Sequence, residues 1–263
     1  MNNFNHFLFD VETTGLKPEK DYTISIGVDM YNNITNKKEN FYELLNWKLL
    51  NGFKNFEIPE DTIKVHGITN EIMMKDGLNP IVVYSHLLNF ILNFIKDSES
   101  KNMDVIVAFN LPFDLNMTKY NLKFLIDYCN DTNNYENIKP YVDLVPDLKE
   151  LYDLFSKNDK NFFIDSLIVD RIFHFEVEGE KVHHNLRDVG LRYGLEEDQN
   201  AHNAMSDTDR MLDIYKCQLN EIYERGLSID QKFEDRLKKK YDRIQTVVYK
   251  KKQSLDYLSN IGD

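Results

Sequence analysis

The first half of the chain alternates apolar and polar positions in the way of a β-sheet. Residues 7–12 form an extended apolar pattern, and residues 24–30 follow the period-two pattern of a half-buried strand. A polar turn at 32–40 separates them from a third strand at 41–45. The three segments together predict a meander of neighbouring strands.

The middle of the chain changes to the pattern of an α/β protein. Asn79 and Pro80 are typical of an N-cap followed by Pro at the first helical position, and apolar residues recur at helical spacing from 87 to 95. The continuous apolar run at 105–109 predicts a strand that is buried on both faces, and a helix follows it. With a further short strand at 162–165, the sequence predicts a mixed five-stranded sheet flanked by helices.

The second half is predicted to be mainly helical. The polar stretch 130–161, with one short helix near its end, is interpreted as an insertion, and a helix at 185–193 would end at Gly194. A later helix carries an apolar stripe up to residue 222. These patterns predict one domain at 1–226 and a basic helical extension at 227–263.

Composition narrows the class of protein. The 263 residues suffice for one domain with a full core, and no apolar run is long enough for a membrane span or a signal peptide. The two cysteines, Cys129 and Cys217, are too few for a disulfide framework, which favours a reducing, cytoplasmic location. The formal charge of −12 argues against non-specific coating of nucleic acid.

Asp10 and Glu12 are the first candidate chemical groups. They lie two apart on a predicted strand, so their side chains point to the same face beside apolar Leu8. Two carboxylates at such a place repel each other unless a cation lies between them. A divalent metal ion is therefore expected at the end of this strand, where Thr13, Thr14 and Gly15 form a turn.

Asp114, Asp207 and His202 could complete such a site. Asp114 follows the end of the buried strand at 105–109, and Asp207 falls in the first turn of a late helix. Five positions on a helix are about 140° apart, so His202 must lie in the loop before that helix to share a site with Asp207. Its ordinary pKa of about 6.5 suits a base that deprotonates water.

Three segments resemble the motifs of the DEDDh exonucleases, a ribonuclease H-like family that includes the proofreading epsilon subunit of bacterial replicases and ribonuclease T. Residues 9–16 resemble the first motif, residues 108–114 the second and residues 202–207 the third, with histidine five positions before the acid. Asn203 stands where the related tyrosine subgroup has Tyr. Phe109 departs from the many members that have His there.

The resemblance implies a fold, a cofactor and a reaction. The fold is a ribonuclease H-like mixed sheet, and Asp10, Glu12, Asp114 and Asp207 would hold two Mg²⁺ or Mn²⁺ ions. His202 would be the general base in 3′→5′ hydrolysis that releases nucleoside 5′-monophosphates. The 3′ nucleotide would be held by a set of substrate-binding residues: Thr13, Thr14, Leu16, His66, Asn110 and Phe113.

Substrate and partners are left open between alternatives. Spacing closest to the proofreading branch favours single-stranded or frayed DNA, but an RNA-trimming exoribonuclease and a non-cleaving nucleic-acid-binding adaptor are also compatible with the motifs. Residues 253–258 resemble a clamp- or polymerase-binding tail, which makes a polymerase a candidate partner. The lysines of the extension form either a solvated helix face or an arm that guides a polyanion.

Four further polar residues have expected roles outside the metal site. Asp165 is interpreted as a helix N-cap and not as a metal ligand, and His66 is either a turn residue or a substrate contact. His183 and His184 are predicted to be solvent-exposed loop residues.

Overall fold

The structure, a computed structural model, describes residues 3–156, 162–174, 176–177, 180–196 and 204–227, together with residues 233, 236 and 239. His202 and most of the predicted extension at 227–263 lie outside these ranges. In the part of the chain that is described, no helix is both long and apolar enough to cross a membrane.

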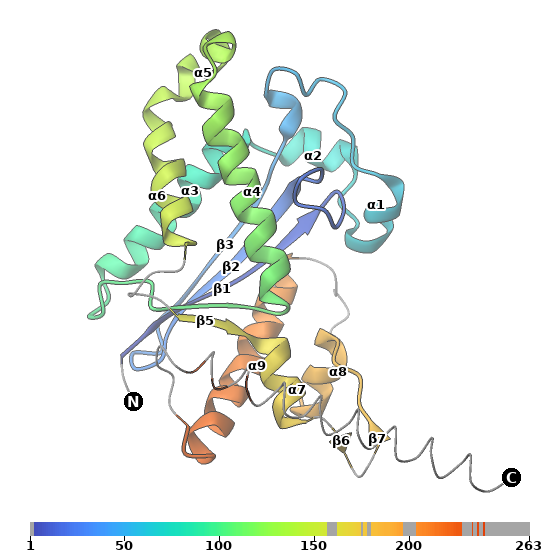
Figure 1. Cartoon of the computed structure of the whole chain (residues 1–263), viewed down its shortest axis with the longest axis vertical. Coiled ribbons are helices and arrows are strands. Elements are labelled where there is room, and N and C mark those ends of the chain that lie inside the picture. Colours follow the sequence, from blue (N-terminus) through green and yellow to red (C-terminus); the bar gives the residue numbers. More distant parts are fainter. Residues whose placement is uncertain are drawn as a thin grey trace, which may run out of the picture.

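A five-stranded sheet with the order β3-β2-β1-β4-β5 forms the centre of the fold (Figure 1). The first three strands pair antiparallel, whereas β4 and β5 join parallel to β1 and to each other, so the predicted mixed sheet is confirmed. The strands are β1 (Asn5–Thr13), β2 (Thr23–Asn32), β3 (Lys38–Leu44), β4 (Val105–Ala108) and β5 (Phe162–Asp165). A separate hairpin pairs β6 (Glu176–Val177) with β7 (Glu180–Lys181).

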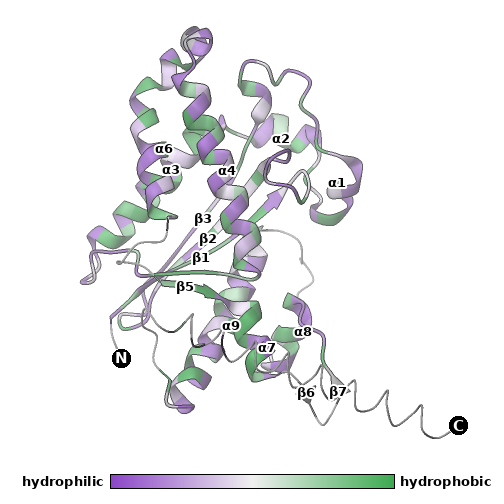
Figure 2. Cartoon of the chain, in the orientation of Figure 1, coloured by the Kyte–Doolittle hydropathy of each residue, from purple (hydrophilic) through white to green (hydrophobic). Residues whose placement is uncertain are grey.

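Helices cover both faces of the sheet. They are α1 (Glu60–His66), α2 (Asn70–Asp76), α3 (Pro80–Lys96), α4 (Leu111–Asn130), α5 (Tyr135–Ile138), α6 (Val145–Leu154), α7 (Ser166–Phe173), α8 (Leu186–Arg192) and α9 (Ala204–Glu224). Short 3₁₀ turns are η1 (Trp47–Leu49), η2 (Thr132–Asn134) and η3 (Lys139–Leu144). Figure 2 shows green and purple positions alternating around the helices, as expected where one side faces the core.

Alternate residues of β1 face two separate hydrophobic cores, one on each side of the sheet. Phe7, Phe9 and Val11 point to the face covered by α3, α4 and α6, whereas Leu8 points to the face covered by α7 and α9. Asp10 and Glu12 share the parity of Leu8, so they lie on the α9 face. The sheet thus directs both acids toward the helix that carries Asp207.

The segment 130–156 differs from its prediction. Three short helical turns precede α6, and Leu148, Leu151 and Phe155 are fully buried against α3 and α4. The prediction of a single short helix was wrong because the preceding turns are polar and carry little hydrophobic periodicity. This segment forms part of the main core.

Candidate active site

Three carboxylates meet where β1 ends. Asp10, Glu12 and Asp207 each offer an oxygen, and these oxygens lie within 4.8 Å of one another. All three side chains are half-buried, which leaves the group open to solvent on one side. Oxygen ligands at this spacing suit a divalent cation, so these acids could bind a metal ion.

The absence of a side chain at position 27 allows the first turn of α9, which carries Asp207, to lie close to Asp10. Gly27 on β2 pairs with Asp10, and an added Cβ atom would lie 2.3 Å from the Ala204 carbonyl oxygen at the start of α9. Only glycine therefore lets the first turn of α9 lie on the sheet beside Asp10. The sequence carried a signal for this role, since a lone Gly inside a strand pattern often marks a close backbone approach.

Asp114 lies beside the three clustered acids. It sits in the first turn of α4 and not at the strand end, because β4 ends at Ala108 and Asn110 turns the chain with a φ of 71°. One oxygen of Asp114 accepts a 3.2 Å hydrogen bond from the N–H of Val11, the residue between Asp10 and Glu12. The four predicted acids are thus brought to one place.

Burial and mutual repulsion raise the pKa of these acids. Burial, followed by the charge of Asp207, raises the pKa of Asp10 to about 7. Burial, then Asp10 and Asp207, raises the pKa of Glu12 to about 8. Burial and Asp10 also raise the pKa of Asp114, although the Val11 N–H opposes them. A bound cation would favour the charged carboxylates and so oppose both burial and repulsion.

Asp165 is confirmed as a helix cap and has a second role that the sequence did not indicate. Its carboxylate accepts hydrogen bonds from Leu167 N (3.0 Å) and Ile168 N (3.4 Å) at the start of α7. The same oxygen accepts from Asn110 N at 3.1 Å. Asp165 therefore joins the turn before α4 to the turn before α7, which fixes the helix end that carries Asp114.

The turn after β1 holds three predicted substrate residues. Thr13 Oγ1 donates to Gly15 O at 2.7 Å, and Thr14 Oγ1 accepts from Tyr22 N at 2.9 Å, so both threonines are buried and engaged within the turn. Leu16 is 80% exposed, the largest value among the exposed large apolar side chains of the described chain. An apolar side chain held out at this place could contact a base.

The other predicted substrate residues vary in exposure. Asn110 is exposed, and Phe113 is half-buried against the main core. His66 is buried at the end of α1, where its Nδ1 accepts from Ile68 N at 3.0 Å. Burial lowers the pKa of His66 to about 4, so its ring is neutral at pH 7. This bonding supports the turn interpretation of His66, and its contact with substrate stays a prediction.

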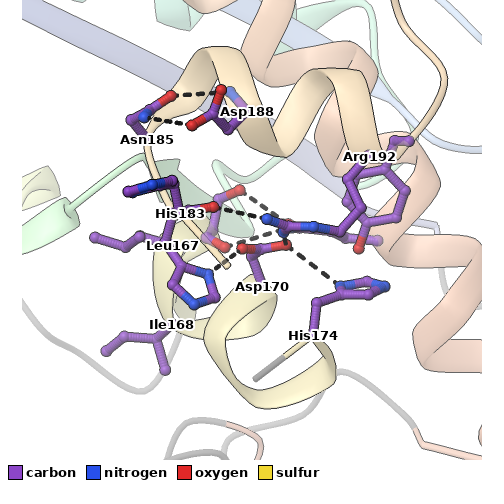
Figure 3. A network of polar contacts seen from close by, with 12 residues as sticks. Leu167, Ile168, Asp170, His174, His183, Asn185, Asp188 and Arg192 are labelled. Atoms are coloured by element: carbon purple, nitrogen blue, oxygen red, sulfur yellow. Dashed lines mark hydrogen bonds and ion pairs between the residues drawn. The ribbon is translucent and has the colours of Figure 1, made fainter. Parts of the chain in front are cut away.

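A second polar network lies around Asp170 (Figure 3). The buried carboxylate accepts from Arg192 Nη1 at 2.5 Å and contacts His184 Nδ1 at 2.6 Å and His174 Nδ1 at 3.3 Å. His184 is therefore half-buried, and its prediction as an exposed residue was wrong because its partner lies 14 positions away. His183 is exposed as predicted.

The sheet order, the flanking helices and the acids at the end of β1 define a ribonuclease H-like nuclease fold. The sequence model of the exonuclease family matches residues 7–215, and the chain belongs to this family. Among curated protein sequences no significant match was found.

Solved structures with the same fold include two exonucleases I and a further nuclease. A zinc-bound complex of E. coli exonuclease I with single-stranded DNA matches with 19% identity and a TM-score of 0.53, over 85% of this chain and 41% of that one. Exonuclease I from Methylocaldum szegediense matches with 18% identity and a TM-score of 0.52, over 84% of this chain and 41% of that one. Cell-death related nuclease 4 matches with 14% identity and a TM-score of 0.54, over 82% of this chain and 64% of that one. The chain thus spans about two fifths of the exonuclease I chains.

Proposed function

We propose that the protein is a metal-dependent 3′→5′ exonuclease that acts on single-stranded or frayed DNA ends. The observation that carries this proposal is the convergence of Asp10, Glu12 and Asp207 within 4.8 Å, with Asp114 hydrogen-bonded to the backbone between the first two. The DNA preference is supported by the likeness to E. coli exonuclease I, whose solved complex contains single-stranded DNA. RNA is the alternative substrate.

The acids fit a pair of Mg²⁺ or Mn²⁺ ions. Both cations prefer carboxylate oxygens and share their remaining coordination positions with water and phosphate, so four acids suffice for two ions. When bound, such ions activate a water molecule and stabilise the departing 3′ oxygen. Asp10, Glu12, Asp114 and Asp207 are the residues that would hold them.

We assign the remaining roles to the other predicted site residues. His202, which lies outside the described residues, would accept the proton of the attacking water. Thr13, Thr14, Asn110 and Phe113 would surround the terminal nucleotide, and Leu16 would lie against its base. Such positioning lowers the entropic part of the barrier.

A labelled-strand assay tests this function. Incubation of the protein and Mn²⁺ with 5′-labelled DNA or RNA of one sequence should give products that shorten from the 3′ end. The nucleic acid that is shortened faster is the preferred substrate. Asp10→Ala and His202→Ala should abolish the ladder, whereas Asp61→Ala, which removes an acid that is 97% exposed on α1, should leave it intact. A wild-type protein that binds both strands and cuts neither would support the adaptor alternative.

A further inference from the structure

A cleft outside the carboxylate site opens between α4 and the turn at 17–22. It has a volume of about 210 Å³, and its walls include Tyr22, Tyr120 and Phe124. Tyr120 lines the cleft and is 46% exposed, so a ligand can reach it from solvent. The volume is below the roughly 300–1,000 Å³ of pockets that enclose whole small-molecule ligands, so it suits a single ring system.

The walls of this cleft are held by the fold. The side-chain oxygen of buried Asn121 accepts from Thr23 N at 2.8 Å, and its amide nitrogen donates to Asp21 O at 3.4 Å, which ties α4 to the turn. The Tyr22 ring packs against Phe124 and Trp47, with centroid distances of 6.1 and 4.7 Å. A ligand would meet a preformed aromatic wall and would spend little binding free energy on ordering it.

The cleft is aligned with the proposed binding site for the 3′ nucleotide. Tyr120 and Phe124 follow Phe113 by seven and eleven positions on α4, which places all three within about 20° of one line along the helix. Seven residues rise about 10 Å, close to the length of three stacked nucleotides at roughly 3.4 Å each. A strand whose 3′ end contacts Phe113 can therefore reach Tyr120 with an upstream base.

The charges around the cleft favour a neutral ring over an anion. Lys20 and Lys123 are opposed by nearby acids. Asp21 is engaged in its own turn, where its carboxylate accepts from Lys17 N at 2.8 Å. Asp127 forms an exposed 3.7 Å ion pair with Lys123, so this lysine has an acidic neighbour. The lining as a whole has more acids than lysines and therefore no excess of positive charge that would attract an anion.

We propose that this cleft binds a nucleobase of the single strand, about three nucleotides from its 3′ end, by stacking on Tyr120. The inference rests on the proposed function, since it extends the path of the same substrate. Aromatic side chains stack on any base with little sequence preference, so the cleft would add affinity for strands of several nucleotides. A substrate that consists of the terminal nucleotide alone would gain no affinity from the cleft.

The test compares a long and a short substrate. An octanucleotide can reach Tyr120, whereas the p-nitrophenyl ester of thymidine 5′-monophosphate occupies only the terminal site. Tyr120→Ala should lower the ratio of kcat/KM for the octanucleotide to that for the ester by about 5- to 150-fold, the range that corresponds to one stacked base. Tyr120→Phe should restore the ratio, and Tyr42→Ala, an aromatic on β3, should leave it unchanged.

Abasic octanucleotides identify the base that is bound. An abasic residue placed three or four positions from the 3′ end should weaken wild-type binding, measured by fluorescence anisotropy, by the same factor as Tyr120→Ala, and the two changes together should cost no more than either. Additive effects, or equal binding of the intact strand by wild type and Tyr120→Ala, would overturn the inference. Because binding is read without cleavage, an inactive wild type would count against the exonuclease and not against the cleft, whereas a wild type that fails to bind would overturn both.

Discussion

Gly27 on β2 lies against Ala204, the first residue of α9, so closely that a Cβ atom at position 27 would come within 2.3 Å of the Ala204 carbonyl oxygen. Gly27 also pairs with Asp10 across the β1–β2 ladder. The distance between the acids of the first and third motifs therefore depends on a residue that has no side chain.

Gly27→Ala should push α9 away from the sheet and separate Asp207 from Asp10 and Glu12. Overpacking of this kind costs about 1–3 kcal/mol of stability. Since the spacing of the acids changes as well, the rise in Tm produced by Mn²⁺ should become smaller. Thermal unfolding with and without Mn²⁺ measures both effects.

Gly52→Ala is a suitable control for this variant. Gly52 has a φ of 87° and no atom near its missing Cβ, so alanine there costs about 1–2 kcal/mol of backbone strain without a clash. Its Mn²⁺ response should equal that of the wild type. A full Mn²⁺ response in Gly27→Ala would contradict the role of Gly27.

The raised pKa values of Asp10 and Glu12 predict an unusual pH dependence. The unfolded chain releases these protons near pH 4, whereas the metal-free folded protein holds them up to pH values of about 7 and 8. The folded state binds more protons in this window, so the stability of the metal-free protein should fall as the pH rises from 4 to 8. Thermal unfolding in a chelator across this range measures the slope.

Metal binding should reverse this trend. Cations bind the deprotonated carboxylates and displace protons, so Mn²⁺ should raise Tm more at pH 8 than at pH 6. At 100 times its dissociation constant the ion adds about 2.7 kcal/mol. An Asp10→Asn, Glu12→Gln double variant should lose most of the Mn²⁺ stabilisation and most of the fall in metal-free stability between pH 4 and pH 8. The same Mn²⁺ response at the two pH values would argue against these acids as ligands.

Local patterns predicted most of the fold, whereas the resemblance to the family motifs predicted which four acids would form the site. The parity of Asp10 and Glu12 and the caps at Asn79 and Asp165 depend on neighbours within a few positions, and the structure confirms them. The five strands of the mixed sheet were also predicted correctly. These features follow from short-range geometry, which a sequence displays directly.

Other features depend on contacts between distant segments. The pairing of His184 with Asp170, the approach of α9 to Gly27, and the second role of Asp165 at Asn110 each join elements that the sequence does not show to be adjacent. His202 lies outside the described residues and stays a prediction, as do the domain boundary at 226 and the roles of the site residues.

Lys38 is expected to help position α9. Its Nζ lies 3.4 Å from buried Asp29 on β2 and also contacts Asp209, two residues after Asp207. Lys38→Met would leave the Asp29 carboxylate buried without a partner, which should cost more than about 1 kcal/mol of stability. Burial already raises the pKa of Asp29 to about 6 against the opposing effect of Lys38, so the variant should take up a proton there.

A double-mutant cycle separates the charge effect from packing. Asp29→Asn combined with Lys38→Met should recover part of the stability that Lys38→Met loses, because no unpaired charge stays buried. Urea unfolding at pH 7.5 gives the free energies of unfolding of the wild type, the two single variants and the double variant. A double variant whose loss of stability equals or exceeds the sum of the two single losses would refute a stabilising ion pair between Asp29 on β2 and Lys38 on β3.

Asp170 should stabilise the α7–α8 region through its charge. Burial raises the pKa of Asp170, but hydrogen bonds from His174, His184 and Arg192 outweigh it and leave the pKa below its ordinary value. Stability from such a group is present above the unfolded pKa of about 3.9 and is lost as the pH falls through the lower folded pKa. Asp170→Asn leaves Arg192 without its buried counter-charge and should cost about 3–5 kcal/mol at pH 7.

Asp188→Asn is the matched control for this variant. Asp188 lies on α8, where its carboxylate accepts from Asn185 Nδ2 at 2.9 Å near the protein surface (Figure 3). The same chemical change there should cost less than about 1 kcal/mol. The stability difference between wild type and Asp170→Asn should also shrink below pH 4, because the wild-type carboxylate then becomes neutral. A difference that stays constant from pH 7 to pH 3 would show that Asp170 acts through its shape and not through its charge.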